Sequence, residues 1–368
     1  MKIIDREKLA VSIERRINED IKLCNVGGAS VLVAQDGEVI YKKHFGSSDT
    51  EGAEVTDGTL FRLASMTKPV TAVAAMILVD RGLLSLDSTV DSFYPAFKNV
   101  RVFKSGEAVT GITVKHLLTH TSGIGSGAAW NESYRVLTDS DTENVQSFVD
   151  FLSAQPISFL PGTKTEYSGV GAFSVLTGII QQISGIPFSE FLSKEIFEPL
   201  GMTDTTFEPS EEQWERLIGM HGKEDGKSVV GRTWDGCVFE KFPPKSYLGG
   251  AGLVSSLSDY YRFASMLLDR GIYGGKRVLS EKAVSNMSTL HFPNNALEGW
   301  GLGVRVITDA RGNVLPAGAF GWSGAYGTHF WIDRDNRMVA IYMKNSRFDG
   351  GAGAKTARNF EKDVYGAL

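Results

Sequence analysis

The sequence of 368 residues predicts an α+β fold, in which an antiparallel sheet is built from strands at both ends of the chain. Two observations predict it: strand-like apolar runs lie near both termini, and helical periodicity dominates the middle. We expect residues 1–62 and 296–368 to form an α/β lobe flanked by helices. Residues 63–295 would form a mostly helical inserted lobe, with the active site in the cleft between the two.

The N-terminal elements follow from apolar spacing and one turn signal. Residues 7–22 have apolar side chains near helical spacing, which predicts an amphipathic helix. Residues 29–34 and 39–44 are strand-like runs on either side of Asp36-Gly37, a pair typical of tight hairpin turns.

The remaining elements alternate in kind along the chain. The middle predicts five helices, at residues 114–118, 145–154, 171–183, 188–195 and 259–268. The C-terminal part predicts strands at 302–307, 330–332 and 338–343 and a closing helix at 354–366.

Composition narrows the class of protein. Hydrophobic residues make up 42% and charged residues 22%, as in ordinary globular proteins, and the formal net charge is -5. That charge and the lack of a Lys/Arg cluster argue against a nucleic-acid partner. Two cysteines, Cys24 and Cys237, are too few for a disulfide framework and are expected to be ordinary thiols. The longest apolar run is too short to span a membrane, and the N-terminus lacks a signal core, so we expect a cytoplasmic protein.

Ser65-Met66-Thr67-Lys68 heads an apolar run that predicts a buried helix. Ser and Lys three residues apart share one helix face, so the Lys can lie beside the Ser hydroxyl and help to activate it. Pro69 fits only the first turn of a helix, which places Ser65 at or just before the helix start, near its free N–H groups. The motif alone is weak, since a Ser-x-x-Lys sequence arises about once by chance in a chain of this length.

Two further segments are ambiguous by themselves. Tyr167 stands just ahead of a predicted helix, where it is either a core or surface aromatic residue or a functional one. The small-residue stretch 321–327 leads into a strand and predicts either a bulge or bend, or a backbone edge that a substrate can approach closely.

Together these segments resemble the serine β-lactamase and penicillin-binding-protein superfamily, most closely its class C branch and, within it, the family VIII carboxylesterases. The resemblance covers nearly the whole chain and implies a β-lactamase/transpeptidase-like fold. It rests on the order and spacing of six segments: 63–69, 117–124, Tyr167-Ser168-Gly169, 199–202, 249–253 and Trp322-Ser323-Gly324.

The resemblance implies acyl transfer through a covalent ester on Ser65, without cofactor or metal. Lys68 would assist Ser65, and Tyr167 would contact the leaving-group oxygen and later the attacking water. Because Lys68 and Tyr167 share their protons when held close together, the assignment of one base stays open. The oxyanion hole would be the backbone N–H groups of Ser65 and Ala325. His120, in the segment 117–124, is expected to be a structural hydrogen-bonding residue.

Two departures from the family pattern bear on substrate. Trp322 stands where classical members have a Lys that meets a substrate carboxylate, and Gly169 stands where they have an Asn. Both changes weaken recognition of β-lactams and D-Ala peptides and leave the acylation residues intact. The expected substrate is therefore a small-molecule carboxylic ester, short-chain or aryl, bound by Trp322, Ser323 and Gly324. Further aromatic candidates for the acyl pocket are Trp130 and Tyr134, in a loop expected after Gly127, and Trp234 and Tyr247.

Other functions stay open or lose support. The alternatives are a β-lactamase or D-amino-acid peptidase with weak anchors, an acyltransferase that uses the same acyl-enzyme, and a non-catalytic binding protein. The last is disfavoured by the intact Ser, Lys and Tyr set. No Gly-x-Ser-x-Gly, His-Glu-x-x-His, Cys-x-x-Cys or nucleotide-binding sequence is present, so α/β-hydrolase, metal and nucleotide sites have no anchor.

Overall fold

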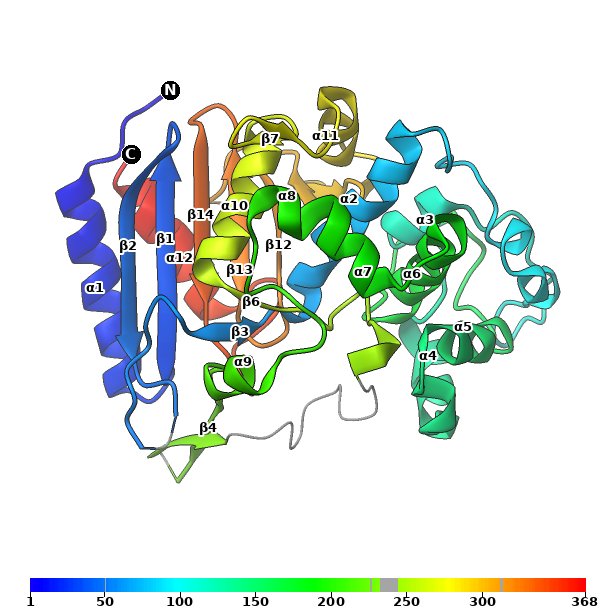
Figure 1. The fold of residues 1–368 in the computed structure, drawn as a ribbon, viewed down its shortest axis with the longest axis horizontal. Coiled ribbons are helices and arrows are strands. Elements are labelled where there is room, and N and C mark those ends of the chain that lie inside the picture. Colours follow the sequence, from blue (N-terminus) through cyan, green and yellow to red (C-terminus); the bar gives the residue numbers. More distant parts are fainter. Residues whose placement is uncertain (50, 226, 232–243, 312–313) are drawn as a thin grey trace.

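A computed structural model describes residues 1–49, 51–225, 227–231, 244–311 and 314–368. Its main feature is an eight-stranded antiparallel sheet in the order β2-β1-β14-β13-β12-β11-β10-β9 (Figure 1). The prediction of a sheet built from both ends of the chain is confirmed. The strands are β1 (Gly28–Gln35), β2 (Glu38–Gly46), β9 (Phe292–Pro293), β10 (Glu298–Trp300), β11 (Arg305–Ile307), β12 (Phe320–Ser323), β13 (His329–Asp333) and β14 (Met338–Met343).

The two ends of the chain meet at the pairing of β1 with β14, in which Ser30 lies opposite Met343. The turn between β1 and β2 has positive φ at Asp36 (51°) and Gly37 (82°), as a two-residue hairpin turn requires. Every residue of β1 is buried, because helices cover both faces of the sheet here.

Helices α1 (Arg6–Lys22) and α12 (Lys355–Gly366) cover one face of the sheet. The apolar stripe of α1 and residues of α12 share one core cluster with Trp331 of β13. On the other face α10 (Leu257–Leu268) packs against β13 and β14, and Figure 1 shows it in front of the sheet. Both terminal helices and α10 were predicted, within a few residues.

Most of the remaining helices lie beside the sheet, toward the right of Figure 1, around the buried helix α2 (Thr67–Asp80), whereas α9 (Glu211–Glu215) lies below β3 (Leu60–Arg62) in that view. The predicted helices are α3 (Val114–Leu118), α5 (Val145–Ser153), α6 (Gly171–Ser184) and α7 (Phe188–Leu192), the last continuing through a π turn (Ser193–Phe197) into α8 (Glu198–Leu200). The helices that the sequence did not predict are α4 (Gly127–Val136), α9 (Glu211–Glu215) and α11 (Glu281–Met287).

Three two-stranded sheets and several 3-10 turns complete the described part of the chain. The small sheets are β3 (Leu60–Arg62) with β6 (Val254–Ser256), β4 (Met220–Glu224) with β5 (Lys227–Gly231), and β7 (Ile272–Tyr273) with β8 (Lys276–Arg277). The 3-10 turns are η1 (Ala64–Met66), η2 (Val90–Ser92), η3 (Pro95–Asn99), η4 (Ser140–Thr142) and η6 (Pro244–Ser246).

The structure corrects two expectations. The strand predicted at 302–307 begins only at Arg305, because Gly303 has a φ of 75° that interrupts extended backbone. The segment after Gly127 was expected to be a loop and is helix α4. The predicted lobe boundaries stay a prediction, and α10, from the middle of the chain, lies on the sheet.

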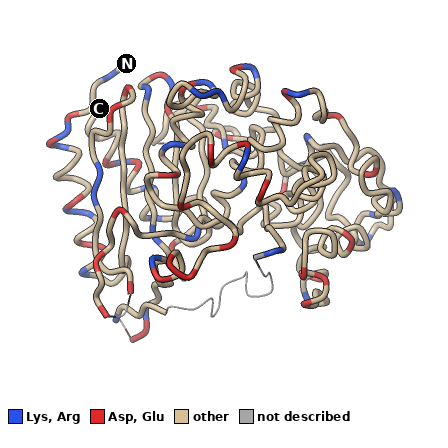
Figure 2. The backbone as a smooth tube through the Cα atoms, viewed as in Figure 1, with Lys and Arg blue, Asp and Glu red and all other residues tan. Residues whose placement is uncertain are grey.

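Charged residues are distributed evenly along the described chain. In Figure 2 the Lys and Arg positions are interspersed with Asp and Glu along the whole described chain, including α1 and α12. Among the described residues, no helix combines the length and the apolar character that crossing a membrane requires.

Candidate active site

Ser65 lies in the turn η1, directly ahead of α2, with Pro69 in the first turn of that helix. Ala64 before it has a φ of 46°, which is unusual for a residue other than glycine. The segment is held by its neighbours: the Leu63 N–H donates to the Leu253 carbonyl at 2.9 Å, and the Thr328 hydroxyl donates to the Leu63 carbonyl at 2.9 Å. The helix start predicted from Pro69 is therefore confirmed, and β6 and the segment after β12 fix Ser65 in place.

Two side chains converge on the Ser65 hydroxyl. The Tyr167 hydroxyl lies 2.7 Å from Ser65 Oγ, and Lys68 Nζ lies 3.3 Å from it. Tyr167 comes from the segment before α6, so the site joins two elements far apart in sequence. The structure thus brings together the three residues that the sequence selected.

Lys68 is fully buried and its Nζ has three acceptors. Besides Ser65 Oγ, it donates to the carbonyls of Gly169 at 2.7 Å and Gly250 at 2.8 Å. Three acceptors match the three N–H groups of an ammonium. Burial lowers the pKa of Lys68, and the nearby Tyr167 hydroxyl opposes that shift.

Aromatic side chains surround the Tyr167 ring. Trp300 stacks on it with ring centroids 6.0 Å apart, and the Trp322 ring lies 5.4 Å away. The Trp322 indole N–H points at the Tyr167 oxygen, with Nε1 3.3 Å from it. Tyr167 itself is 38% exposed, so its hydroxyl stands between a packed aromatic wall and the open pocket.

His120 is a structural residue of this wall. Its Nδ1 accepts a hydrogen bond from the Ser168 N–H at 3.1 Å, and its ring lies 4.6 Å from that of Tyr167. Burial, with a smaller contribution from the Lys68 charge, keeps the pKa of His120 well below its usual value. A neutral His120 therefore orients the segment that carries Tyr167.

The candidate oxyanion donors lie where the end of β12 meets η1. Neither the Ser65 N–H nor the Ala325 N–H has a hydrogen-bond partner within the described ranges. A Cβ built on Gly324 would overlap the Leu63 carbonyl oxygen and the Thr328 hydroxyl. Gly324 therefore allows the close approach that places the Ala325 backbone beside Ser65.

A cavity of about 340 Å³ opens in front of these groups. Five predicted residues line it: Ser65, Tyr167, Trp322, Ser323 and Ala325. Sequence reasoning missed other lining residues, from the β9–β11 region and the segment before α12: Asn294, Glu298, Trp300, Arg305, Gly351 and Ala352. No motif marks them: strand register brings Glu298, Trp300 and Arg305 to the site, and the packing of loops brings the others.

A buried polar network supports the Ser323 side of the cavity. Ser323 Oγ lies 2.8 Å from His329 Nδ1, and His329 Nε2 lies 3.0 Å from Glu361 of α12. Arg305 contacts both Glu361 at 3.6 Å and Glu298 at 3.4 Å. Burial raises the pKa of Glu361, but His329 and Arg305 outweigh it and hold that pKa below its usual value. The network ties α12 to β11 and β13.

The other predicted pocket residues are not among those that line this cavity. Trp130 and Tyr134 lie on α4 with ring centroids 5.7 Å apart, and Trp130 also packs edge-on against Phe148. Tyr247 packs against Phe207, 5.7 Å away. Gly324 contributes backbone behind the cavity wall. Trp234 and Cys237 lie outside the described residues, and Cys24 is a free thiol.

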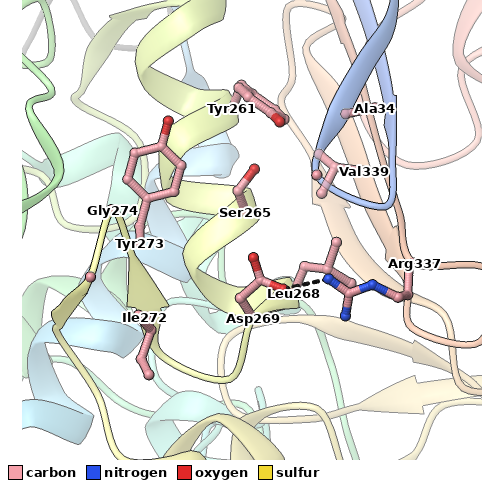
Figure 3. A pocket seen from close by; sticks show the side chains of 12 residues that line it. Ala34, Tyr261, Ser265, Leu268, Asp269, Ile272, Tyr273, Gly274, Arg337 and Val339 are labelled. Atoms are coloured by element: carbon pink, nitrogen blue, oxygen red, sulfur yellow. Dashed lines mark hydrogen bonds and ion pairs between the residues drawn. The ribbon is translucent and has the colours of Figure 1, made fainter.

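A second cavity of about 430 Å³ lies between α10 and the turns of the sheet (Figure 3). Ser265 and Tyr261 face it, and Arg337 at its edge is bound by Asp269 at 2.9 Å and Asp36 at 2.6 Å. Those two carboxylates raise the pKa of Arg337. Tyr261 and Ser265 are hydrogen-bonded to each other there, but the lining contains no Lys to match Lys68. The described residues also contain no group of three or more His, Cys, Asp or Glu residues suited to a metal ion.

Comparison with known proteins places these features in a family. The sequence profile described as Beta-lactamase matches residues 13–362. Esterase EstB of Burkholderia gladioli is 30% identical over 384 residues, covering 96% of this chain and 94% of its own. Penicillin-binding protein 4* of Bacillus subtilis is 27% identical, covering 87% of this chain and 68% of its own. The solved structure of EstCE1, a hydrolase with promiscuous acyltransferase activity, is similar with a TM-score of 0.82 at 23% identity, over 98% of this chain and 99% of its own. Because the profile spans nearly the whole chain, this protein belongs to the beta-lactamase family.

Proposed function

We propose that the protein hydrolyses carboxylic esters, short-chain or aryl, through an acyl-enzyme on Ser65. One observation carries the proposal: the Tyr167 hydroxyl and the Lys68 ammonium both contact Ser65 Oγ at the edge of an open cavity. A serine activated by neighbouring groups in a substrate-sized cavity is the arrangement that covalent acyl transfer needs.

Acylation starts from the phenolate of Tyr167, formed when its hydroxyl loses its proton to solvent, and this phenolate takes the proton of Ser65 Oγ. Ser65 Oγ attacks the ester carbonyl carbon, and the carbonyl oxygen becomes an oxyanion held by the N–H groups of Ser65 and Ala325. Such donors contribute roughly 3–4 kcal/mol each to the transition state. Tyr167 then returns the proton to the alcohol oxygen as the C–O bond breaks, and the alcohol leaves.

Deacylation repeats the same steps with water. A water molecule beside Tyr167 loses its proton to the phenolate and attacks the acyl carbon, and the proton passes back to Ser65 Oγ. In this scheme Lys68 stays a cation, because its three acceptors, two carbonyls and Ser65, oppose the loss of a proton that burial favours. Its charge stabilises the negative charge that moves between Ser65 and Tyr167.

The side chains that line the cavity support an ester substrate. Trp322 offers no cation to a substrate carboxylate, and Gly169 offers no amide side chain. The aromatic rings of Tyr167, Trp300 and Trp322 suit an apolar acyl or aryl group. The relative EstB is an esterase by name, at 30% identity over nearly the full length of both chains.

A second candidate is hydrolysis of a β-lactam or a D-amino-acid peptide. It is favoured by the similarity to penicillin-binding protein 4*, which is 27% identical over 334 residues. Both reactions would use the same acyl-enzyme, so only relative rates separate them.

The test is turnover of p-nitrophenyl butyrate and of a chromogenic cephalosporin by the purified protein and by Ser65→Ala. Fast ester turnover that Ser65→Ala abolishes supports the proposal, whereas dominant lactam turnover would promote the second candidate. Ser265→Ala is the matched control, since it removes a hydroxyl from the second cavity and should keep full activity. No Ser65-dependent turnover of either compound would overturn both.

A further inference from the structure

Trp322 does more than line the cavity wall. It lies in β12 opposite Phe330 of β13, and its side chain is only 7% exposed. The backbone of β12 and the ring of Trp300, whose centroid lies 4.8 Å from that of Trp322, hold the indole in place. Because the ring is held in this way, its N–H points at the Tyr167 oxygen, with Nε1 3.3 Å from that oxygen.

Two donors of different kinds approach the Tyr167 oxygen, the Lys68 ammonium and the Trp322 indole. The three N–H groups of Lys68 go to Ser65 and to the carbonyls of Gly169 and Gly250. Lys68 Nζ lies 4.8 Å from the centroid of the Tyr167 ring, and its ammonium also interacts with the Tyr167 hydroxyl. Trp322 adds a second, neutral donor, whose position is fixed by the strand that carries it.

We propose that Trp322 is a positioning residue whose indole N–H stabilises the phenolate form of Tyr167, the form that then takes the proton of Ser65. The inference rests on the proposed function, in which Tyr167 is the base. The balance is simple: the proton moves from Ser65 Oγ to the Tyr167 oxygen, and the indole keeps its own hydrogen. An indole N–H only donates, so it favours the charged form of its partner in every step.

This role would explain the presence of Trp at position 322, where classical family members have Lys. A neutral donor stabilises a phenolate less than an ammonium does. Tyr167 is therefore expected to reach its basic form at a higher pH than it would with a second cation at position 322. The acid limb of the pH–rate profile reports this directly, since it follows the group that must lose a proton.

The test is the pH dependence of kcat/KM for p-nitrophenyl butyrate in Trp322→Phe, which keeps an aromatic ring and removes the N–H. We expect the acid limb to move up by about one pH unit, with kcat about tenfold lower at neutral pH and recovering at alkaline pH. KM should change little. Trp322→Lys should move the limb the opposite way.

Trp300→Phe is the matched control, because it changes a neighbouring indole whose Nε1 has no partner among the described residues. It should leave the acid limb in place, whatever it does to the rate. If Trp322→Phe does not fold, 3-benzothienylalanine at position 322 replaces only the N–H by sulfur and gives the same readout. An unmoved acid limb with a raised KM would overturn the proposal and leave Trp322 as a wall residue.

A second readout separates this inference from the proposed function. The rate at which a fluorophosphonate labels Ser65 reports its activation without any ester turnover. If the protein labels but cleaves no ester, the proposed function fails while the labelling profile still tests Trp322. A labelling rate that responds to pH identically in wild type and Trp322→Phe would refute the inference alone.

Discussion

Gly169 is the residue where the departure from the family pattern is open to a direct test. A Cβ built there meets no atom within 4 Å, so a side chain fits without displacing its neighbours. We predict that Gly169→Asn folds normally and raises the ratio of cephalosporin to ester turnover by about two- to tenfold, as one new hydrogen bond allows. The measurement is kcat/KM for both substrates, with Gly169→Ala as the control for bulk. An equal change in both variants would show that the amide has no part.

His221 illustrates a residue whose burial governs stability. It is 2% exposed, and neither ring nitrogen has a hydrogen-bond partner in the ranges that the structure describes. Burial, with the charges of Lys344 and Lys223, lowers its pKa to about 4. Between the unfolded value near ~6.5 and that lower pKa, the unfolded chain binds the extra proton. The free energy of unfolding therefore falls as the pH drops through this window, by up to roughly 3 kcal/mol.

We predict that His221→Phe removes this part of the acid sensitivity. A Phe ring fits beside Phe348, whose centroid lies 5.3 Å from that of His221, and gives up no hydrogen bond of the described structure. Urea unfolding at pH 7.5 and pH 5 should show a smaller loss of stability in the variant than in the wild type. An unchanged loss would mean that other groups cause the acid sensitivity.

At the scale of elements, the contact of β12 with η1 brings together the two backbone segments of the proposed oxyanion hole. We predict that Gly324→Ala lowers kcat by about 10²-fold, because its Cβ pushes the Ala325 N–H away from Ser65. Overpacking should also cost about 1–3 kcal/mol of stability. The measurements are kcat and Tm, and Gly366→Ala, whose Cβ enters open space at the end of α12, is the control. Full activity in Gly324→Ala would disprove the contact's importance.

The prediction of helices and strands succeeded where the apolar periodicity is strong. It failed where the backbone conformation of a glycine sets the start of an element. The α1 helix and the β1–β2 and β13–β14 hairpins were predicted because apolar spacing and turn residues agree there. Helix α4 was missed because it begins at Gly127, with a φ of 56°, which resembles a loop. The strand before Ile307 was drawn too long because nothing in its apolar run signals the positive φ of Gly303.

The part of the site that lies in recognisable sequence motifs could be predicted from the sequence. Ser65, Lys68 and Tyr167 were selected from the sequence and lie together in the structure. Arg305 and Trp300 were not selected, because their place at the cavity depends on the register of β10 with β11 and of β11 with β12. That register is set by packing across the whole sheet, which no local pattern contains.

At the scale of the whole molecule, the two termini lie side by side. The Asp5 N–H donates to the Ala367 carbonyl at 2.9 Å, and Figure 1 shows N and C near each other. The cytoplasmic location and the two-lobe division, by contrast, stay predictions of the sequence.

We predict that a circular permutant survives, with the termini joined by a short Gly/Ser linker and the chain opened between Gly274 and Gly275. Both glycines are exposed in the turn from β7 to β8, away from Ser65. Tm should fall by a few degrees at most, and kcat should change less than about threefold. The control is a permutant opened between Ala325 and Tyr326, which should fold but lose activity. Loss of folding in the first permutant would show that chain order itself is needed.

The Thr328–Leu63 hydrogen bond has a consequence for biosynthesis. It joins residues 265 positions apart, and β14 must enter the sheet between β1 and β13. While the ribosome is still making the last strands, the segment that carries Ser65 has been translated, but the segment that carries Ala325, the proposed second oxyanion donor, has not. On the proposed mechanism, the emerging chain cannot form an acyl-enzyme with an ester, and we expect catalytic activity only once the C-terminal strands are in place.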